Sequence, residues 1–264
     1  MGYMTGVYAA TKKDGTKYFR SSVTHRGKHI SLGSFPTESL AHSAYVEALS
    51  LLANKGTFPE HYEQHQTALS FEKWVVLTNF SNNGLYIKTP VYLLETSFLY
   101  YLSPTDVLHF DADDLFYYSK HAIMRRGSHL FVSDYGMQVN ILSRYGIHAH
   151  SVAGRDYRFI NGDTSDFRYS NIEVINKYFG VQKQLQGMFP LYMVKIHVKG
   201  DLLVGRYPEE ITAAIAYNKA ADTLRQKGFS RNFPGNYIEE LSPEEYQAIY
   251  NSIDLPDSIK KWTP

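Results

Sequence analysis

The sequence predicts an α+β protein with two small modules, each a three-stranded antiparallel sheet plus one helix, on either side of a central domain. Three observations predict it. The residues between Gly6 and Gly56 recur between Gly180 and Gly228, with identical spacing from the aromatic Phe35 or Tyr207 onward. Within each copy the apolar period changes from two residues to three or four. The stretch between the copies lacks this pattern and contains an acidic run, residues 90–119, with five Asp or Glu and no Lys or Arg. The expected domains are residues 1–66, 67–178 and 179–264.

Each copy opens with the alternation of a half-buried strand. In the second copy three apolar residues alternate with basic ones: Val194, Ile196 and Val198 with Lys195, His197 and Lys199. In the first copy Phe19, Ser21 and Val23 alternate with Arg20, Ser22, Thr24 and Arg26. We expect hairpin turns at Gly27-Lys28 and at Gly200-Asp201.

A helical period follows each pair of strands. Thr37 starts the first helix, and Pro208-Glu209-Glu210 starts the second, with proline and acids in its first turn. Alanines recur on one face of both helices, at Ala41, Ala44 and Ala48 and at Ala213, Ala216 and Ala220. Such small residues let a helix lie close to a sheet, so each copy should be a sheet backed by one helix.

The helix covers one face of each sheet and leaves the other face toward solvent. The side chains expected there or at its turns are Arg20, Ser22, Thr24, Arg26 and Lys28 in the first copy, and Lys195, His197, Lys199 and Arg206 in the second. Rows of cationic and hydrogen-bonding side chains suit the major groove of DNA. An ordinary solvated sheet face is the alternative, and recurrence of the pattern in both copies weighs against it.

These residues carry a resemblance to a known domain. The segments "LGSFPTESLAHSAYVEA" and "GRYPEEITAAIAYNKAA" resemble the Apetala-two/ethylene-response-factor type of DNA-binding domain. In bacteria and phages this module often accompanies homing endonucleases. The second copy is the better match, because it keeps an Ala-Ala-x-Ala-Tyr run where the first has His42 and Ser43. The resemblance implies double-stranded DNA as the partner.

The central segment from Tyr157 to Asn176 is similar to the ββα-metal hairpin of HNH nucleases. It keeps the turn and scaffold residues of that family: Asn161-Gly162-Asp163, Asp166 with Arg168, and Asn171-Ile172. Asp166 and Arg168 are expected to form a local polar clamp. At the reactive positions Arg158 replaces the metal-binding Asp and Phe159 replaces the general-base His. Little room remains before Gly180 for the family's metal-binding helix, so the resemblance implies a degenerate HNH-like core.

Cleavage of a phosphodiester by such a site requires a metal ion and a base. We therefore expect no catalytic residue, no metal ligand and no cofactor. A relocated metal site built from His148, His150 and Asp156 is the alternative, and it would make the chain an HNH-type nickase. The arginines Arg155, Arg158 and Arg168 are candidates for a third DNA contact.

Charge and composition complete the expectation. Residues 1–35 carry six Lys or Arg against Asp14 alone, whereas residues 237–259 carry six acids and no base. Basic patches of this kind attract phosphate backbones. The absence of cysteine and of a long apolar run or signal pattern favours a cytoplasmic, nucleoid-associated protein with no membrane contact.

The sequence thus predicts a sequence-specific transcriptional regulator, derived from a homing endonuclease of bacteria or phages and lacking cleavage activity. Homodimerisation, or a protein partner at the acidic middle or tail, is a further expectation. A protein–protein interaction module is the second alternative function.

Overall fold

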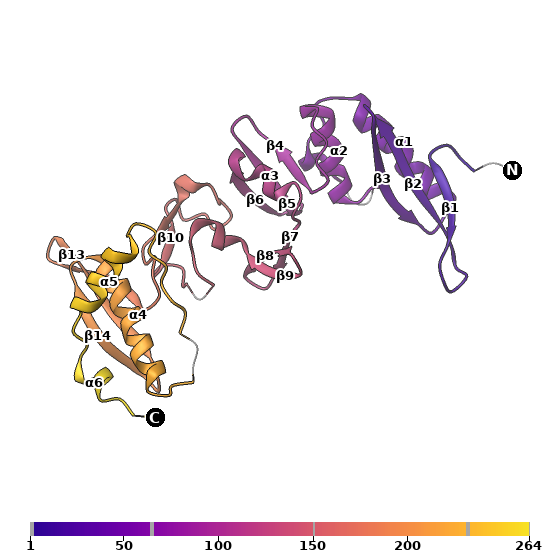
Figure 1. Ribbon diagram of the computed structural model, residues 1–264. Coiled ribbons are helices and arrows are strands. Elements are labelled where there is room, and N and C mark those ends of the chain that lie inside the picture. Colours follow the sequence, from indigo (N-terminus) through magenta and orange to yellow (C-terminus); the bar gives the residue numbers. More distant parts are fainter. Residues whose placement is uncertain (1–2, 64–65, 150, 231–232, 264) are drawn as a thin grey trace. The chain divides into compact units, whose positions relative to one another are not determined.

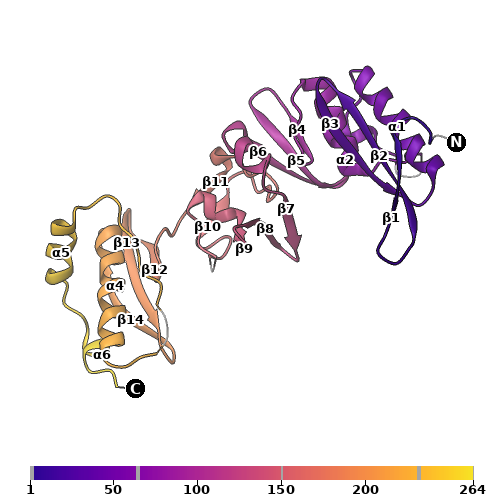
Figure 2. The ribbon, with the colours of Figure 1, turned by 45° about the vertical axis from the view of Figure 1, so that its right-hand side comes forward.

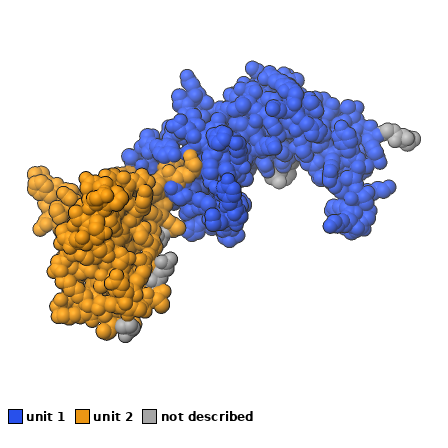
Figure 3. All heavy atoms as spheres, in the orientation of Figure 1, with its two compact units in different colours: residues 1–143, 159–172 blue, residues 144–158, 173–264 orange. Residues whose placement is uncertain are grey.

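The computed structural model describes residues 3–63, 66–149, 151–230 and 233–263. Its contacts divide the chain into two compact units (Figure 3). Unit 1 contains residues 1–143 and 159–172, and unit 2 contains residues 144–158 and 173–264. The chain re-enters unit 1 within strand β10 (Tyr157–Phe159) and returns to unit 2 within strand β11 (Ile172–Val174).

The first copy folds as a three-stranded antiparallel sheet with one helix against it (Figure 2). The elements of this first module are β1 (Val7–Thr11), β2 (Lys17–His25), β3 (Lys28–Phe35) and α1 (Glu38–Ala53). Thr37 caps α1, since its hydroxyl accepts a hydrogen bond from the Leu40 amide at 3.2 Å. Ala41, Ala44 and Ala48 are fully buried, which confirms the predicted small-residue face.

The second copy repeats this arrangement in unit 2. The elements of this second module are β12 (Val181–Gln186), β13 (Phe189–His197), β14 (Asp201–Tyr207) and α4 (Glu210–Gln226). Ala213, Ala216 and Ala220 are again fully buried. One detail differs from the prediction: Glu209 is the cap residue, so Pro208 precedes the helix instead of lying in its first turn.

Both modules contain a β-bulge at the same place. In the first, the pairing shifts between Ser21 and Ser22, and Leu32 on β3 is the extra residue. In the second, the shift falls between Val194 and Lys195, and Val204 on β14 is the extra residue. Leu32 and Val204 are both buried. The bulge therefore gives a common origin from which positions in the two modules can be matched.

The predicted turns were wrong by about one residue. Arg26 and Gly27 form the turn between β2 and β3, with positive φ values of 46° and 74°. Positive φ at both central residues is what a type I′ hairpin turn requires. In the second module residues 198–200 connect the strands, and Asp201 already belongs to β14. Arg26 and Lys199 thus lie in turns and do not continue the rows of strand side chains.

The rest of unit 1 includes two α-helices and two further three-stranded sheets (Figure 1). Its elements are α2 (Phe71–Asn83), β4 (Val91–Leu93), β5 (Ser97–Ser103), β6 (Asp106–Asp111), α3 (Leu115–Tyr118), β7 (Ile123–Arg126), β8 (His129–Asp134) and β9 (Met137–Asn140). Short 3-10 helices lie at η1 (Pro59–His61), η2 (Ala112–Asp114), η3 (Ile141–Tyr145) and η4 (Tyr169–Asn171). Tyr100 and Tyr118 are buried in this core.

The segment that resembles HNH nucleases forms a two-stranded hairpin, β10 with β11. Its connecting loop packs along β6, where the Phe167 amide donates to the His109 carbonyl at 2.7 Å. The predicted clamp is present: Arg168 donates to both carboxylate oxygens of Asp166, at 2.9 and 2.7 Å. Residues 175–180, all of them described, contain no helix, and the chain runs directly into β12.

The acidic C-terminal segment contains α5 (Pro243–Ser252) and α6 (Asp257–Lys260). It folds onto α4, with α5 on the side of α4 away from the sheet (Figure 2) and α6 also in contact with β14. The Lys219 ammonium on α4 donates to the carbonyls of Tyr250 and Ile253, at 2.6 and 2.7 Å. The side of the second-module sheet away from α4 carries neither of these helices.

Candidate nucleic-acid interface

The face of each module's sheet that lies away from its helix is here called the open face. Along β2 the buried Ser21 and Val23 alternate with Arg20, Ser22 and Thr24. Arg20 and Thr24 are exposed and Ser22 is half-buried. Along β13 the buried Val194 and Ile196 alternate with Lys195, which is half-buried, and His197, which is exposed. The predicted residues of β2 and β13 therefore lie on the open faces. Lys28 does not, because it pairs with His25, in the row of the buried Val23.

On both open faces, the cross-strand pair that lies one pair from the bulge contains one arginine. In the first module Arg20 on β2 pairs with Ser34 on β3, one pair from the bulge. In the second module the matched pair is Met193 on β13 with Arg206 on β14. The guanidinium thus comes from the central strand in one module and from the edge strand in the other.

Neighbouring side chains hold the polar groups of the first open face. Arg20 Nη2 donates to the Tyr18 hydroxyl at 2.7 Å, and its guanidinium carbon lies 5.4 Å from the centre of the Tyr18 ring. Thr24 Oγ1 lies 3.5 Å from Nδ1 of His29 on β3. The phenol of Tyr18 restricts the rotamers of the Arg20 side chain, so a contact made by this guanidinium would cost less side-chain entropy.

The turn arginine of the first module is held elsewhere. The Arg26 guanidinium lies beside Gly84, the left-handed residue that ends α2. The C-terminal end of a helix carries partial negative charge, which favours a cation there. Arg26 therefore supports the packing of the hairpin end on α2. Lys28, the first residue of β3, is exposed.

The second open face is the more cationic of the two. Arg206 on β14 and Lys199 in the turn are exposed, beside Lys195 on β13. His197 Nδ1 lies 2.8 Å from Asp201 Oδ1, and this hydrogen bond lowers the pKa of the Asp201 carboxyl. Because Asp201 offsets any charge on His197, the cations of this face are chiefly Lys195, Lys199 and Arg206.

Three glutamines of the second open face were not identified from the sequence. Gln182, Gln184 and Gln186 occupy every second position of β12. They pair with Met193, Leu191 and Phe189 on β13, which places them on the same face. Gln184 Nε2 lies 3.8 Å from the Met193 sulfur. The signal was available, since glutamine at every second position of a strand marks one face.

Each arginine predicted as a third DNA contact is engaged by a carboxylate. Arg155 donates to both oxygens of Asp156, with Nη2 at 2.7 Å from Oδ2. Arg158 pairs with Glu173 across the β10–β11 hairpin. Arg168 forms the clamp with Asp166. These partners compensate the positive charges locally, so the three arginines add little net attraction for phosphate.

The residues considered for a relocated metal site have other roles. His148 Nε2 lies 2.9 Å from the Lys177 carbonyl oxygen, and its ring stacks on Phe179. Burial of the Asp156 carboxyl opposes its ionisation, but hydrogen bonds from Arg155, the Val152 amide and Asn176 lower its pKa below the usual value. His150 lies outside the described residues. Within the described chain no three His, Asp or Glu side chains group as metal ligands would.

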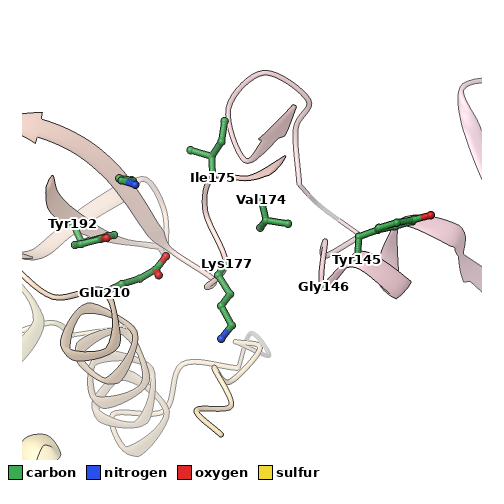
Figure 4. A pocket seen from close by; sticks show the side chains of 8 residues that line it. Tyr145, Gly146, Val174, Ile175, Lys177, Tyr192 and Glu210 are labelled. Carbon is green, nitrogen blue, oxygen red and sulfur yellow. The ribbon is translucent and has the colours of Figure 1, made fainter. Parts of the chain in front are cut away.

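A pocket of about 280 Å³ lies within unit 2, on the same side of the sheet as α4 (Figure 4). Tyr192 and Lys183, which pair across β13 and β12, line it together with Glu210 of α4. The Lys177 ammonium at its rim pairs with Glu240 at 2.7 Å, and this hydrogen bond raises the pKa of Lys177. The pocket is therefore separate from the open face.

No family model, curated protein or solved structure matches the chain. In the described part of the chain no helix has both the length and the apolar character needed to cross a membrane.

Proposed function

We propose that the chain binds double-stranded DNA through the open faces of its two modules, as a sequence-specific regulator that does not cleave its target. The observation that carries the proposal is the arginine in the matched cross-strand pair of each module, Arg20 on the central strand of one and Arg206 on the edge strand of the other. Arginine paired with the major-groove edge of guanine is the commonest base-specific contact. Two modules on one chain raise the affinity beyond that of either alone.

The residues near these arginines support a role in the recognition of DNA bases. Lys195 and Lys199 supply charge for phosphate oxygens, and Gln182 and Gln184 supply amides of the kind that pair with adenine. A sheet backed by a helix on one side only can enter the major groove with its other face. The β-β-β-α order of both modules is also what the Apetala-two resemblance implies.

The central hairpin supports the absence of cleavage. The clamp of Asp166 with Arg168 and the buried Asn171 keep the loop in shape. Arg158 and Phe159 stand where the HNH resemblance implies a metal ligand and a base, and neither side chain supplies such a group. We propose that this hairpin is a degenerate HNH core kept for its packing.

Salt-dependent binding tests the proposal. The affinity of the full chain for a labelled mixed-sequence duplex should fall with salt, with a log–log slope of about −0.9 for each phosphate neutralised. Lys195→Ala combined with Lys199→Ala, which removes the two proposed phosphate contacts, should reduce the slope by about two. Lys261→Ala removes a cation that pairs with Asp257 away from the sheet, so it should leave the slope unchanged. Binding that is absent, or indifferent to salt, would overturn the proposal.

A further inference from the structure

The end of the β12–β13 hairpin carries large apolar side chains in water. Leu185, Met188 and Phe189 have exposed fractions of 74%, 91% and 75%. The matching end of the first module contains Lys12 and Lys13 in its place. Clustered exposed apolar residues mark a contact surface. The two modules therefore differ in what their hairpin ends can contact.

Strand pairing places part of this apolar surface on the open face. Side chains alternate along β13, so Phe189 and Leu191 follow the same row as Lys195. Gln184 on β12 pairs with Leu191, and Arg206 on β14 lies opposite Met193. The apolar row therefore has an amide on one side and a guanidinium on the other.

This combination matches the chemistry of the major groove. Guanine offers acceptors to arginine, adenine offers a donor and an acceptor to an amide, and thymine alone presents an apolar group, its C5-methyl. Lys195 continues the row along β13, Arg206 lies opposite Met193, and Lys199 is in the turn at the far end of the strand. The charge of these cations complements a phosphate backbone. Duplex DNA is thus the occupant favoured by both the apolar and the charged groups.

We propose that Phe189 and Leu191, with Met188 at the hairpin end, contact thymine methyl groups, so that the second module selects thymine beside the bases contacted by Arg206 and Gln184. This inference rests on the proposed function, because it assumes that the open face enters the major groove. It adds a base preference that belongs to one module and not to the other.

Removal of the methyl groups from the DNA gives a direct test. The full chain is titrated with poly(dA-dT) and with poly(dA-dU) duplexes of equal length, which differ only in the C5-methyl. Binding to the thymine duplex should be tighter by about fourfold for each methyl group buried. The double variant Met188→Ser and Phe189→Ser, which keeps Leu191, should lose most of this difference, through weaker binding to the thymine duplex alone.

Two further variants serve as controls. Tyr237→Ser removes a side chain that is 79% exposed in the same unit but outside the sheet, and should keep the thymine preference. Phe189→Leu keeps an apolar group at the position and should retain most of the preference. Circular dichroism and thermal unfolding show whether each variant keeps the native fold.

The contrary outcomes separate this inference from the proposed function. Equal affinity for both duplexes, with salt-dependent binding intact, overturns the thymine contact and leaves DNA binding standing. A preference of unchanged size in the double serine variant also overturns it. A changed oligomeric state of that variant, with an unchanged preference, would assign the hairpin end to a protein partner instead. Absent binding to both duplexes at low salt overturns both proposals.

Discussion

The ring of Tyr217 on α4 lies against Gly180 at the start of β12. A Cβ on Gly180 would stand 2.2 Å from Tyr217 Cδ2, and this residue has a φ of +70°. Gly6 and Tyr45 repeat the contact in the first module, where the same distance is 2.1 Å and φ is +78°. The contact joins the beginning of the sheet to the middle of the helix. It explains why Gly-Val and Ala-Tyr recur together in the two copies.

Gly180→Ala should lower the free energy of unfolding of unit 2 by about 2–4 kcal/mol, because it adds backbone strain to a steric overlap. Urea unfolding followed by the fluorescence of Trp262, which packs on the core of this unit, measures the loss in a Trp74→Phe background. Gly187→Ala is the matched control, since Gly187 has a φ of +66° but no atom near its missing Cβ. Gly187→Ala should lower the free energy of unfolding only by the contribution of backbone strain. Equal losses would show that the tyrosine ring is not the cause.

Arg206→Ala should weaken DNA binding more than Arg20→Ala does. Each variant removes the one guanidinium of the matched cross-strand pair. Lys195 and Lys199 lie on or beside the second open face only, so we expect this face to be the main DNA contact and its arginine to contribute more. A site selected from random duplexes, bound by each variant at constant salt, gives the two losses. We expect about 1–3 kcal/mol for Arg206 when its guanine is present. A larger loss with Arg20→Ala would make the first module the main contact.

Acid should destabilise unit 1 in part through Asp166. The hydrogen bond from Arg168 lowers the pKa of this carboxyl below its ordinary value of 3.8. A lowered pKa contributes stability above pH 3.8, and that contribution disappears as the pH falls through the folded-state pKa. Asp166→Asn should therefore flatten the decline of stability below about pH 4.

Trp74 fluorescence in a Trp262→Phe background follows the unfolding of unit 1 for this comparison. Asp113→Asn removes an exposed carboxylate of the same unit and should retain the decline. The clamp would have no part in acid stability if the Asp166→Asn protein declined as steeply as the unaltered one.

Supercoiled plasmid incubated with the chain and Mg²⁺ or Mn²⁺ should remain uncut. The expected reason is that Phe159 has no group that accepts a proton and Arg158 cannot bind a divalent cation. Gel electrophoresis separates supercoiled, nicked and linear forms. Nicking that disappears in the His148→Ala protein would instead establish a relocated active site.

The modules were predictable because their signals are local. The alternation around Val194 and the alanine spacing around Ala216 each specify an element and its buried face. The sheet of β4, β5 and β6 was not predicted. β4 has only three residues, and the buried strand β5 lacks a clear alternation that would separate it from a helix. The turn at Arg26 was misplaced because a positive φ is uncommon for arginine.

The candidate site was predictable only as far as strand periodicity reaches. Alternation identified Arg20 and Lys195 as residues of the open faces. The pairing of Arg158 with Glu173 depends instead on the register of the β10–β11 hairpin, which the sequence does not fix. The same holds for Arg206 and Met193, since the bulge shifts one strand against the other. Arg206 and Ser34 correspond to each other because each lies in the cross-strand pair that is one pair from the bulge of its module.

The two copies differ in length only at their hairpin ends. Residues 12–16 connect β1 to β2, whereas residues 187–188 suffice between β12 and β13. The next turn has residues 26–27 in one copy and residues 198–200 in the other. Insertions and deletions have thus been absorbed outside the bulge, which keeps the strands in frame. The hairpin ends can therefore be exchanged without a change of strand register. Insertion of residues 185–190 between β1 and β2, in place of the lysine-containing connection, would give the first module an apolar hairpin end.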